Sequence, residues 1–175
     1  LQPVRFGSLV AFFEEERRFV ELIDDAAAGR RTRSGHLVFH RRRSIWSVPF
    51  DAESLSTSGE AAVIIEGAGN EFSLSDRGDL LAELDMPRGD ARLRLVRGDT
   101  SFSRPDTNAL SPSVSPSGEQ IAVQRLLGSD WEIWIHEAAS GLPARQLTFD
   151  GGFFPIWSPD GRRLLFWRPG KGLLS

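Results

Sequence analysis

Three histidines are the residues of this sequence that most directly suggest metal chemistry. His36 and His40 are four residues apart, and His136 lies far along the chain. In a β-strand that spacing separates the first two by roughly 13 Å, at about 3.3 Å per residue, so they cannot share one ion without a bulge. His136 has no second ligand nearby in the sequence, and a protein metal site needs several. We therefore interpret all three as surface histidines and assign no metal ligand.

Hydrolytic chemistry needs a nucleophile with its base, or a pair of carboxylates. No Gly-x-Ser-x-Gly elbow occurs, and the serines lie in turn positions, where hydroxyls bond the local backbone. Asp24-Asp25 and Glu14-Glu15-Glu16 lie at expected turns or strand ends, where carboxylates are normally solvated. A glycosidase pair stays open, because carboxylates distant in sequence can meet in space. The sequence assigns no catalytic or cofactor-binding residue, and we expect a chain that is not an enzyme.

Three short charged motifs suggest binding. Arg88-Gly89-Asp90 and Arg97-Gly98-Asp99 spell a tripeptide known from adhesion ligands, but they bracket an expected strand, Ala91–Val96, and so fall where turns belong. Arg41-Arg42-Arg43 is too short a basic run to bind nucleic acid without aromatic neighbours, and we expect a solvated hairpin tip there. The net charge of −3 also gives no reason to expect nucleic acid as a partner.

The composition is that of an ordinary globular domain, with 40% hydrophobic and 26% charged residues. The longest apolar runs, such as Leu9–Phe13, are about as long as a strand and far below the ~20 residues that cross a bilayer, so we expect no membrane insertion. No cysteine is present, which excludes disulfides and thiolate chemistry. Residues 1–20 contain no signal-peptide pattern, and Leu1 in first position suggests a processed or excised chain.

The elements that must position these residues follow a repeat of about 43 residues. A polar turn that ends in glycine and precedes an apolar strand recurs four times, with the glycines at Gly35, Gly78, Gly118 and Gly161. This period matches a four-stranded propeller blade. The sequence therefore predicts an all-β fold, a partial β-propeller of about four blade units of four antiparallel strands, with each glycine in the turn between the first two strands.

The repeat divides the chain, as a single incomplete domain, into blade units at 1–30 (partial), 31–69, 70–110, 111–152 and 153–175 (partial). Residues 9–13 resemble a second strand, and Arg30–Arg33 a last strand of the same unit. The chain ends on another second strand at Phe166-Trp167. Open blade edges are templates for pairing. Three outcomes follow: the chain continues in a longer protein, closes on itself, or forms a homo-oligomer with another copy.

The large apolar residues recur with the repeat. Trp46 and Trp134 occupy matching third-strand positions and Trp157 precedes a turn, so we expect them to pack between blades. Ligand stacking by Trp131 or Trp167 is the alternative. The predicted core also contains eight strand residues: Leu37, Phe39, Ile121, Val123, Ile133, Ile135, Leu164 and Phe166.

The segment Pro155–Phe166, with its Trp157-Ser158-Pro159-Asp160-Gly161 core, resembles the TolB-like β-propeller repeat, a relative of WD-type repeats. The likeness extends to Ser113–Ile135 and is weaker at residues 70–100. Residues 35–51 and Gly59-Glu60 are similar to TolB-like propellers attached to bacterial receptor Ser/Thr kinases, although no kinase motif is present.

This resemblance implies a propeller of about six or seven blades. It also implies a bacterial scaffold or sensor module that binds a protein partner or a small ligand through inter-strand loops, in the periplasm or another extracytoplasmic compartment. The alternative function is the substrate-gating propeller of a prolyl-oligopeptidase-type serine peptidase, whose catalytic domain would follow this chain.

Overall fold

The computed structural model describes residues 7–14, 17–84, 92–98, 100–105, 109–138 and 144–175, and these form strands and turns. Within these ranges there is no helix of the length and apolarity that would cross a membrane. The chain divides into two compact units, Leu1–Asn70 and Glu71–Ser175, and each is described by itself.

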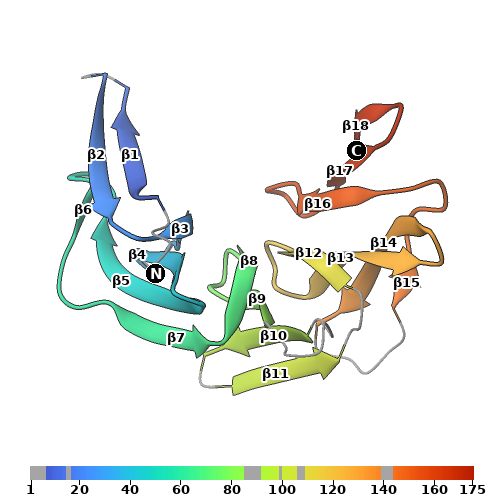
Figure 1. Ribbon diagram of the computed structural model, residues 1–175, viewed down its shortest axis with the longest axis horizontal. Coiled ribbons are helices and arrows are strands. Elements are labelled where there is room, and N and C mark those ends of the chain that lie inside the picture. The colour runs from blue at the N-terminus through green and yellow to red at the C-terminus, as the bar shows by residue number, and fades with distance from the viewer. Residues whose placement is uncertain (1–6, 15–16, 85–91, 99, 106–108, 139–143) are drawn as a thin grey trace, which may run out of the picture. The chain divides into compact units, whose positions relative to one another are not determined.

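The first unit contains a hairpin and a blade that forms a five-stranded sheet (Figure 1). The hairpin pairs β1 (Leu9–Phe13) with β2 (Arg18–Ile23) in antiparallel register. The blade has the strand order β3, β4, β5, β7, and the short β6 pairs with the far end of β5. The bounds of these strands are β3 (Ala27–Arg31), β4 (His36–Arg41), β5 (Ser44–Asp51), β6 (Ser56–Thr57) and β7 (Ala62–Glu66).

The second unit contains two four-stranded blades and a three-stranded one, all antiparallel meanders (Figure 1). The first blade has β8 (Ala68–Leu74), which begins at the boundary between the units, β9 (Leu80–Leu84), β10 (Arg92–Arg97) and β11 (Thr100–Pro105). The second has β12 (Ala109–Val114), β13 (Gln120–Leu127), β14 (Asp130–Glu137) and β15 (Arg145–Gln146). The third has β16 (Phe153–Trp157), β17 (Leu164–Arg168) and β18 (Gly172–Leu174).

The predicted repeat is confirmed by its turns. Gly35, Gly78, Gly118 and Gly161 each lie between the first two strands of a blade, with φ from 69° to 87°. This left-handed region carries a steric cost for residues with a Cβ, so glycine is the favoured residue there. The same spacing in sequence and in strands makes the blade the unit of this fold.

Two strand assignments at the ends of the chain are wrong. Residues 30–33 are not the last strand of the predicted partial blade 1–30, because Ala27–Arg31 pairs with β4 and is the first strand of the next blade. The expected boundary between residues 30 and 31 therefore falls inside β3. The small residues before Arg30 resemble a turn in sequence. The chain also ends on a third strand rather than a second, because Gly172–Leu174 pairs with β17. A three-residue strand carries no readable hydrophobic period.

A bulge recurs in three of the first strands, and the sequence repeat did not predict it. Ala28, Ser111 and Phe154 have φ of 51°, 50° and 53°, and each lies at a break in the register with the second strand. Each stands four residues before the hydroxyl residue of the following turn. Bulges bend a strand and redirect a side chain. Non-glycine residues rarely adopt this conformation, so the recurrence indicates a constraint shared by the blades.

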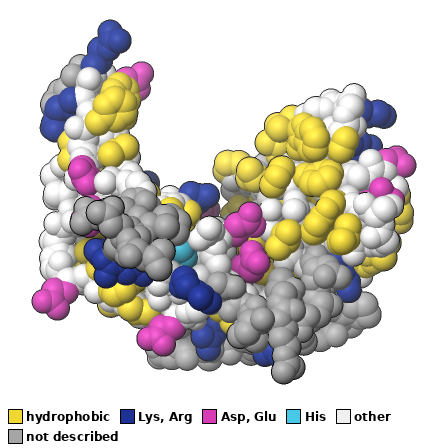
Figure 2. Space-filling model, in the orientation of Figure 1, with side chains coloured by type: hydrophobic (Ala, Val, Ile, Leu, Met, Phe, Trp, Pro, Cys, Tyr) yellow, Lys and Arg dark blue, Asp and Glu magenta, His cyan; other side chains and the backbone are white. Residues whose placement is uncertain are grey.

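The core of the second unit lies between its blades. Along β13, Ile121 and Val123 pack with residues of the preceding blade, and Ala122 between them packs with Leu164 of the following blade. Alternating side chains of one strand therefore serve two interfaces, as the period of two requires. Hydrophobic side chains also gather over β16–β18 (Figure 2).

The predicted core is confirmed for seven of its eight residues, which are 8% exposed or less, while Phe166 is half-buried. In the first unit, Leu37 and Phe39 pack with Leu22 and Ile23 of the β2 strand. The expectation that these residues contact an adjacent sheet therefore holds in both units.

Truncating a residue between blades should destabilise the second unit strongly. Leu81 is 1% exposed and Leu127, at a hairpin tip, is 53% exposed. We expect Leu81→Ala to lower the free energy of unfolding by about 2–5 kcal/mol, because it removes buried methyl groups and leaves a cavity. The matched Leu127→Ala should change it by about 0.5 kcal/mol or less. Urea unfolding of both variants measures this difference, and equal losses would contradict the assigned strand faces.

Candidate functional site

The structure corrects the interpretation of the histidines as surface residues. His40 is 2% exposed and His136 is 8% exposed, while His36 is half-buried at the start of β4. The two buried imidazoles lie on strand faces that neighbouring segments cover, which the sequence spacing did not reveal. Among the described residues, no three His, Asp or Glu side chains gather in a way that would hold a metal ion.

His40 of the first unit has a counterpart in Gln124 of the second unit, and their shared contacts indicate a structural role. The Nε2 atom of His40 lies 3.3 Å from the carbonyl oxygen of Ala68, where β8 begins. Gln124 occupies the same register in β13, and its Oε1 accepts a 3.0 Å hydrogen bond from the amide of Phe154 in β16. In both blades a buried polar side chain of the second strand thus reaches the first strand that follows. Buried polar groups normally have such partners.

The basic and acidic motifs of the first unit pair with each other. Arg42 donates to Asp25 at 2.9 Å, and Arg41 lies 3.6 Å from Asp24. Arg41-Arg42-Arg43 form a hairpin tip as expected, and Arg42 and Asp24 are largely exposed, with side chains 73% and 71% accessible. The sequence did not reveal that the two motifs pair, because the β4–β5 hairpin tip lies beside the segment that enters β3. Glu14 is exposed, and Glu15-Glu16 lie outside the described residues.

Arg97, the arginine of the second Arg-Gly-Asp sequence, is bonded within the fold. Arg97 donates to both carboxylate oxygens of Asp79, at 2.9 and 3.3 Å, and to the carbonyl oxygen of Gly118 at 2.6 Å. It is therefore engaged within the fold rather than presented as an adhesion ligand. Asp99 and the whole of Arg88-Gly89-Asp90 lie outside the described residues.

Three of the five tryptophans pack between sheets, Trp131 is half-buried and Trp167 is exposed. Trp46, Trp134 and Trp157 each pack against a core cluster between sheets, as expected. The indole of Trp157 also donates to the carbonyl oxygen of Ser113 in the preceding blade at 3.2 Å. Trp167 differs, because it is 40% exposed and makes an edge contact with Phe153.

Three turns of the second unit form the strongest candidate for a binding surface. We call residues 75–79, 115–120 and 158–163 the turn surface. In each turn a serine hydroxyl accepts a 3.0 Å hydrogen bond from a backbone amide at the far end, and the serines are Ser75, Ser115 and Ser158. Serine is common in such turns because its hydroxyl replaces a backbone partner. This explains why serine recurs with the glycine in the sequence.

Neighbouring turns are bonded to each other across the blade interface. The amide of Asp76 donates to the carbonyl oxygen of Pro116 at 3.1 Å, and the Arg77 guanidinium donates to that of Ser117 at 3.2 Å. Buried Asp79 holds Arg97, which reaches Gly118 as described above. The β8–β9 turn is therefore fixed to the β12–β13 turn by three separate donors.

Buried carboxylates, which a glycosidase would need, have structural partners here. Asp79 also accepts a bond from the Ser75 hydroxyl at 3.1 Å. Glu132, which is 4% exposed, accepts from the Thr148 hydroxyl at 2.5 Å and from the Gly151 amide at 3.1 Å. Both acids thus tie segments of the fold together.

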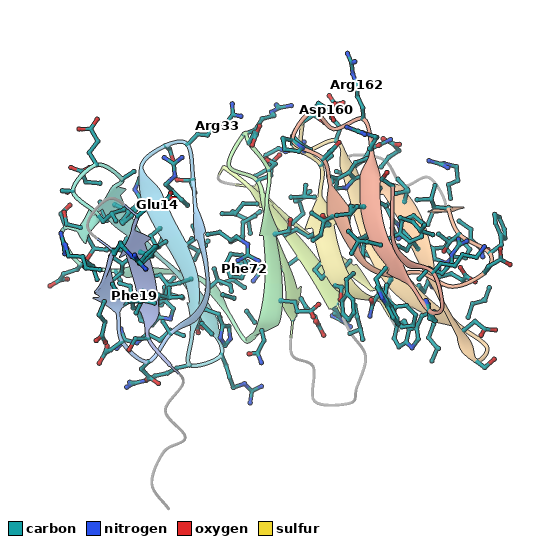
Figure 3. The ribbon with its side chains drawn as sticks, turned by 90° about the horizontal axis from the view of Figure 1, so that it is seen from above. Glu14, Phe19, Arg33, Phe72, Asp160 and Arg162 are labelled. Carbon is teal, nitrogen blue, oxygen red and sulfur yellow. The ribbon has the colours of Figure 1, made fainter. Side chains whose placement is uncertain are left out.

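The exposed rim of the turn surface carries both signs of charge. Arg77, Glu119, Asp160, Arg162 and Arg163 are exposed there. Figure 3 shows Asp160 and Arg162 together at the edge of the β16–β17 hairpin. The hydroxyl of Ser158 and the amide of Arg162 donate to Asp160 and lower the pKa of its carboxyl, because both bonds favour the ionised form. Asp160 is thus a fixed negative charge near neutral pH.

A second surface feature is apolar. An open hollow of about 410 Å³ lies on β16–β18 and is lined by Phe154, Ile156, Leu165, Phe166, Trp167 and Leu173. We call this the terminal face. Ligand stacking was the alternative role considered for Trp167, and Phe166 was expected in the core. The outward-facing positions of β16 were hidden by its bulge at Phe154.

Comparisons with solved structures agree with this architecture. A putative TolB from Agrobacterium tumefaciens aligns with a TM-score of 0.70 and 17% identity, over 89% of this chain and 59% of that one. TolB from Acinetobacter baumannii aligns with a TM-score of 0.72 and 16% identity, over 95% and 44%. XC5397 from Xanthomonas campestris, described as a gluconolactonase, aligns with a TM-score of 0.64 and 15% identity, over 95% and 64%. The chain spans about half the length of the two TolB structures.

The chain therefore has a β-propeller fold and forms part of such a propeller. More particularly, its fold is that of TolB-like propellers, as the resemblance of its repeats implied. Neither the family models nor the curated proteins provide a match to this sequence.

Adding a methyl group at Gly118 should damage the turn surface. A Cβ at Gly118 would lie 1.8 Å from Oδ2 of Asp79, whereas one at Gly128 would meet nothing within 4 Å; both glycines have positive φ. We expect Gly128→Ala to lower the free energy of unfolding by about 1 kcal/mol from backbone strain. Gly118→Ala should cost about 3 kcal/mol, because it also displaces the buried Asp79 carboxylate from its partly buried ion pair with Arg97. Chemical denaturation of the two variants tests this, and equal effects would refute the close approach.

The pKa of Asp160 should depend on Ser158. We expect NMR titration to show the Asp160 carboxyl ionising below the ordinary aspartate range, and Ser158→Ala to raise its pKa. Because the folded-state pKa is depressed, the stabilisation is complete above the unfolded pKa and disappears as pH falls through the folded one. Asp51, whose pKa is lowered by the amides of Ser54 and Glu53, should not respond to this variant. An unchanged Asp160 titration in Ser158→Ala would contradict the assignment.

Proposed function

We propose that this chain is a non-catalytic scaffold or sensor module that binds a protein partner through the turn surface of its second unit. The observation that carries the proposal is the set of hydrogen bonds between neighbouring turns, from Asp76, Arg77 and Arg97. Loops fixed before binding lose less conformational freedom when a partner arrives.

The chemistry of the turn surface supports a polar partner. Arg162 and Arg163 stand beside Asp160 on one hairpin, and Arg77 and Glu119 lie on the others. Charges at an interface rim mainly provide specificity and a faster association. A protein segment with a matching arrangement of acidic and basic groups fits such a surface. The proposed location is extracytoplasmic in a bacterium, which follows from the TolB-like resemblance.

The substrate-gating propeller of a serine peptidase remains the second proposal. A gating propeller would also use its loops to contact its partner, which would be a peptidase domain. The identity of the contacted protein therefore distinguishes the gating role from the scaffold role. The activity assays described below include lactone hydrolysis, because a gluconolactonase has a similar fold and one fold supports many functions.

The binding proposal predicts a partner that contacts Arg162. A photo-crosslinking amino acid placed at position 162, in cells that express the protein, should yield one defined crosslinked complex with the partner. The same amino acid at position 127, at an exposed hairpin tip, should not. Arg162→Glu with Arg163→Glu should then weaken binding of that purified partner by about tenfold or more. A hydrolase as the crosslinked protein would favour the gating role.

Two outcomes would overturn the scaffold proposal. One is an equal pattern of products from positions 162 and 127. The other is turnover of a peptide, glycoside, phosphoryl or lactone substrate by the purified chain that a single substitution in this chain abolishes, because such turnover requires a catalytic group.

A further inference from the structure

The sequence contains two Asp-Gly dipeptides, Asp150-Gly151 and Asp160-Gly161, and both lie in the second unit. In such a dipeptide the amide nitrogen of glycine can attack the carboxyl carbon of aspartate, because glycine has no Cβ to hinder the approach. The product is a succinimide ring. When water opens this ring, it gives either aspartate or isoaspartate, in which the main chain runs through the side-chain carboxyl. The fold holds the reacting groups of the two dipeptides differently.

At Asp160-Gly161 both reacting groups are engaged elsewhere. The Asp160 carboxylate accepts hydrogen bonds from the Ser158 hydroxyl and, at 3.1 Å, from the Arg162 amide. These bonds favour the ionised form and lower the pKa of the carboxyl, and a carboxylate is a poor target for a nucleophile. The Gly161 amide donates to the carbonyl oxygen of Ser158 at 2.9 Å, and a carbonyl oxygen is too weak a base to remove its proton. This dipeptide is therefore protected by its turn.

At Asp150-Gly151 the carboxyl group is accessible. The side chain of Asp150 is 85% exposed, and Arg168 lies 4.0 Å from its carboxylate, which is beyond hydrogen-bond distance. The Gly151 peptide is held on its other side, where its carbonyl oxygen accepts a 3.2 Å hydrogen bond from Nε of Arg168. The amide is therefore fixed while the carboxyl can move toward it.

A buried carboxylate faces the Gly151 amide. This amide donates to Oε1 of Glu132 at 3.1 Å. Glu132 is 4% exposed, and its second oxygen accepts from the Thr148 hydroxyl, which fixes the orientation of the carboxylate. A group that removes a proton must lie within about 2.6–3.2 Å of the atom that carries it. Glu132 meets this requirement, whereas the carbonyl oxygen beside Gly161 is no base.

We propose that Asp150 is a site of spontaneous isoaspartate formation, with Glu132 as the base. Glu132 takes the amide proton of Gly151 while the nitrogen forms a bond to Cγ of the protonated Asp150 carboxyl. The bond from Cγ to the hydroxyl breaks, and the hydroxyl leaves as water with the proton that Glu132 returns. A second water molecule then opens the ring, so the modification consumes no other reactant. This inference does not depend on the proposed partner of the turn surface.

The modification would loosen the entry to β16. The Gly152 amide donates to the carbonyl oxygen of Trp131 at 2.8 Å, next to the bond from Gly151 to Glu132. Gly152 is also tightly enclosed, because a Cβ there would lie 2.7 Å from the Ile133 side chain. Isoaspartate adds one methylene group to the main chain between these bonds and β15. The aged protein should therefore unfold at a lower urea concentration than fresh protein.

Ageing of the purified chain in warm neutral buffer tests the proposal, with Asp160 as an internal reference. Peptide mapping with an isoaspartyl methyltransferase should find at least about tenfold more isoaspartate at position 150 than at position 160. In urea, where the fold is lost, the two positions should react at similar rates. Equal amounts in the folded protein, more at position 160, or none at position 150 would each overturn the proposal.

Variants test the base. Glu132→Gln keeps an acceptor for the Gly151 amide but removes the base, so isoaspartate at position 150 should form about tenfold more slowly or less. Glu137→Gln, which changes an exposed acid of the same strand, should leave the rate unchanged. An unchanged rate in a Glu132→Gln protein that is folded by circular dichroism would refute the role of Glu132.

Asp150→Glu provides an independent measurement, because a glutamate would have to close a larger and slower ring. This exposed substitution should keep its urea midpoint during ageing, while the unchanged protein loses stability. An equal loss of stability in both proteins would contradict Asp150 as the site.

Discussion

A propeller blade is a sheet with two apolar faces, and this constraint organises the rest of the protein. A strand alternates its side chains between the faces, so one strand must satisfy two different neighbours. In β13, Ile121 and Val123 serve the preceding blade while Ala122 serves the following one. Removing either neighbour exposes apolar surface, at about 25 cal/mol per Å². The inter-blade contacts thus supply the hydrophobic stabilisation that an isolated sheet lacks.

Buried polar groups determine how neighbouring blades are placed against each other. The Asp79–Arg97 ion pair, with the bond from Arg97 to Gly118, joins two turns. Gln124 and Glu132 satisfy backbone amides of the segment that leads into and begins β16. Such buried groups are costly if a partner is lost. They therefore fix how one blade enters the next, while the apolar residues provide the attraction. Two turns of the turn surface, 75–79 and 115–120, are held together in this way, although its rim carries exposed charges.

The two candidate surfaces have different physical characters. The turn surface consists of three polar turns, of which 75–79 and 115–120 are linked by hydrogen bonds, and its charges suit selective recognition. The terminal face is apolar, and at four matching registers it carries larger side chains than the blade before it. A repeat protein uses such a face for stacking rather than for selective recognition. The two surfaces share no residue of the described chain.

The sequence by itself determined the class of fold. Glycine at a spacing of about 43 residues indicates a recurring tight turn, and the β-branched and aromatic runs beside it favour strands. Seven predicted core residues, the four turns and the inter-blade tryptophans follow from that local chemistry. Only the tertiary structure decided which polar residues are buried, as for His40, or paired, as for Asp25 and Arg97. Their partners are 17 to 28 residues away along the chain. The bulges at Ala28, Ser111 and Phe154 were equally hidden, because three different residue types adopt one conformation that neighbouring strands impose.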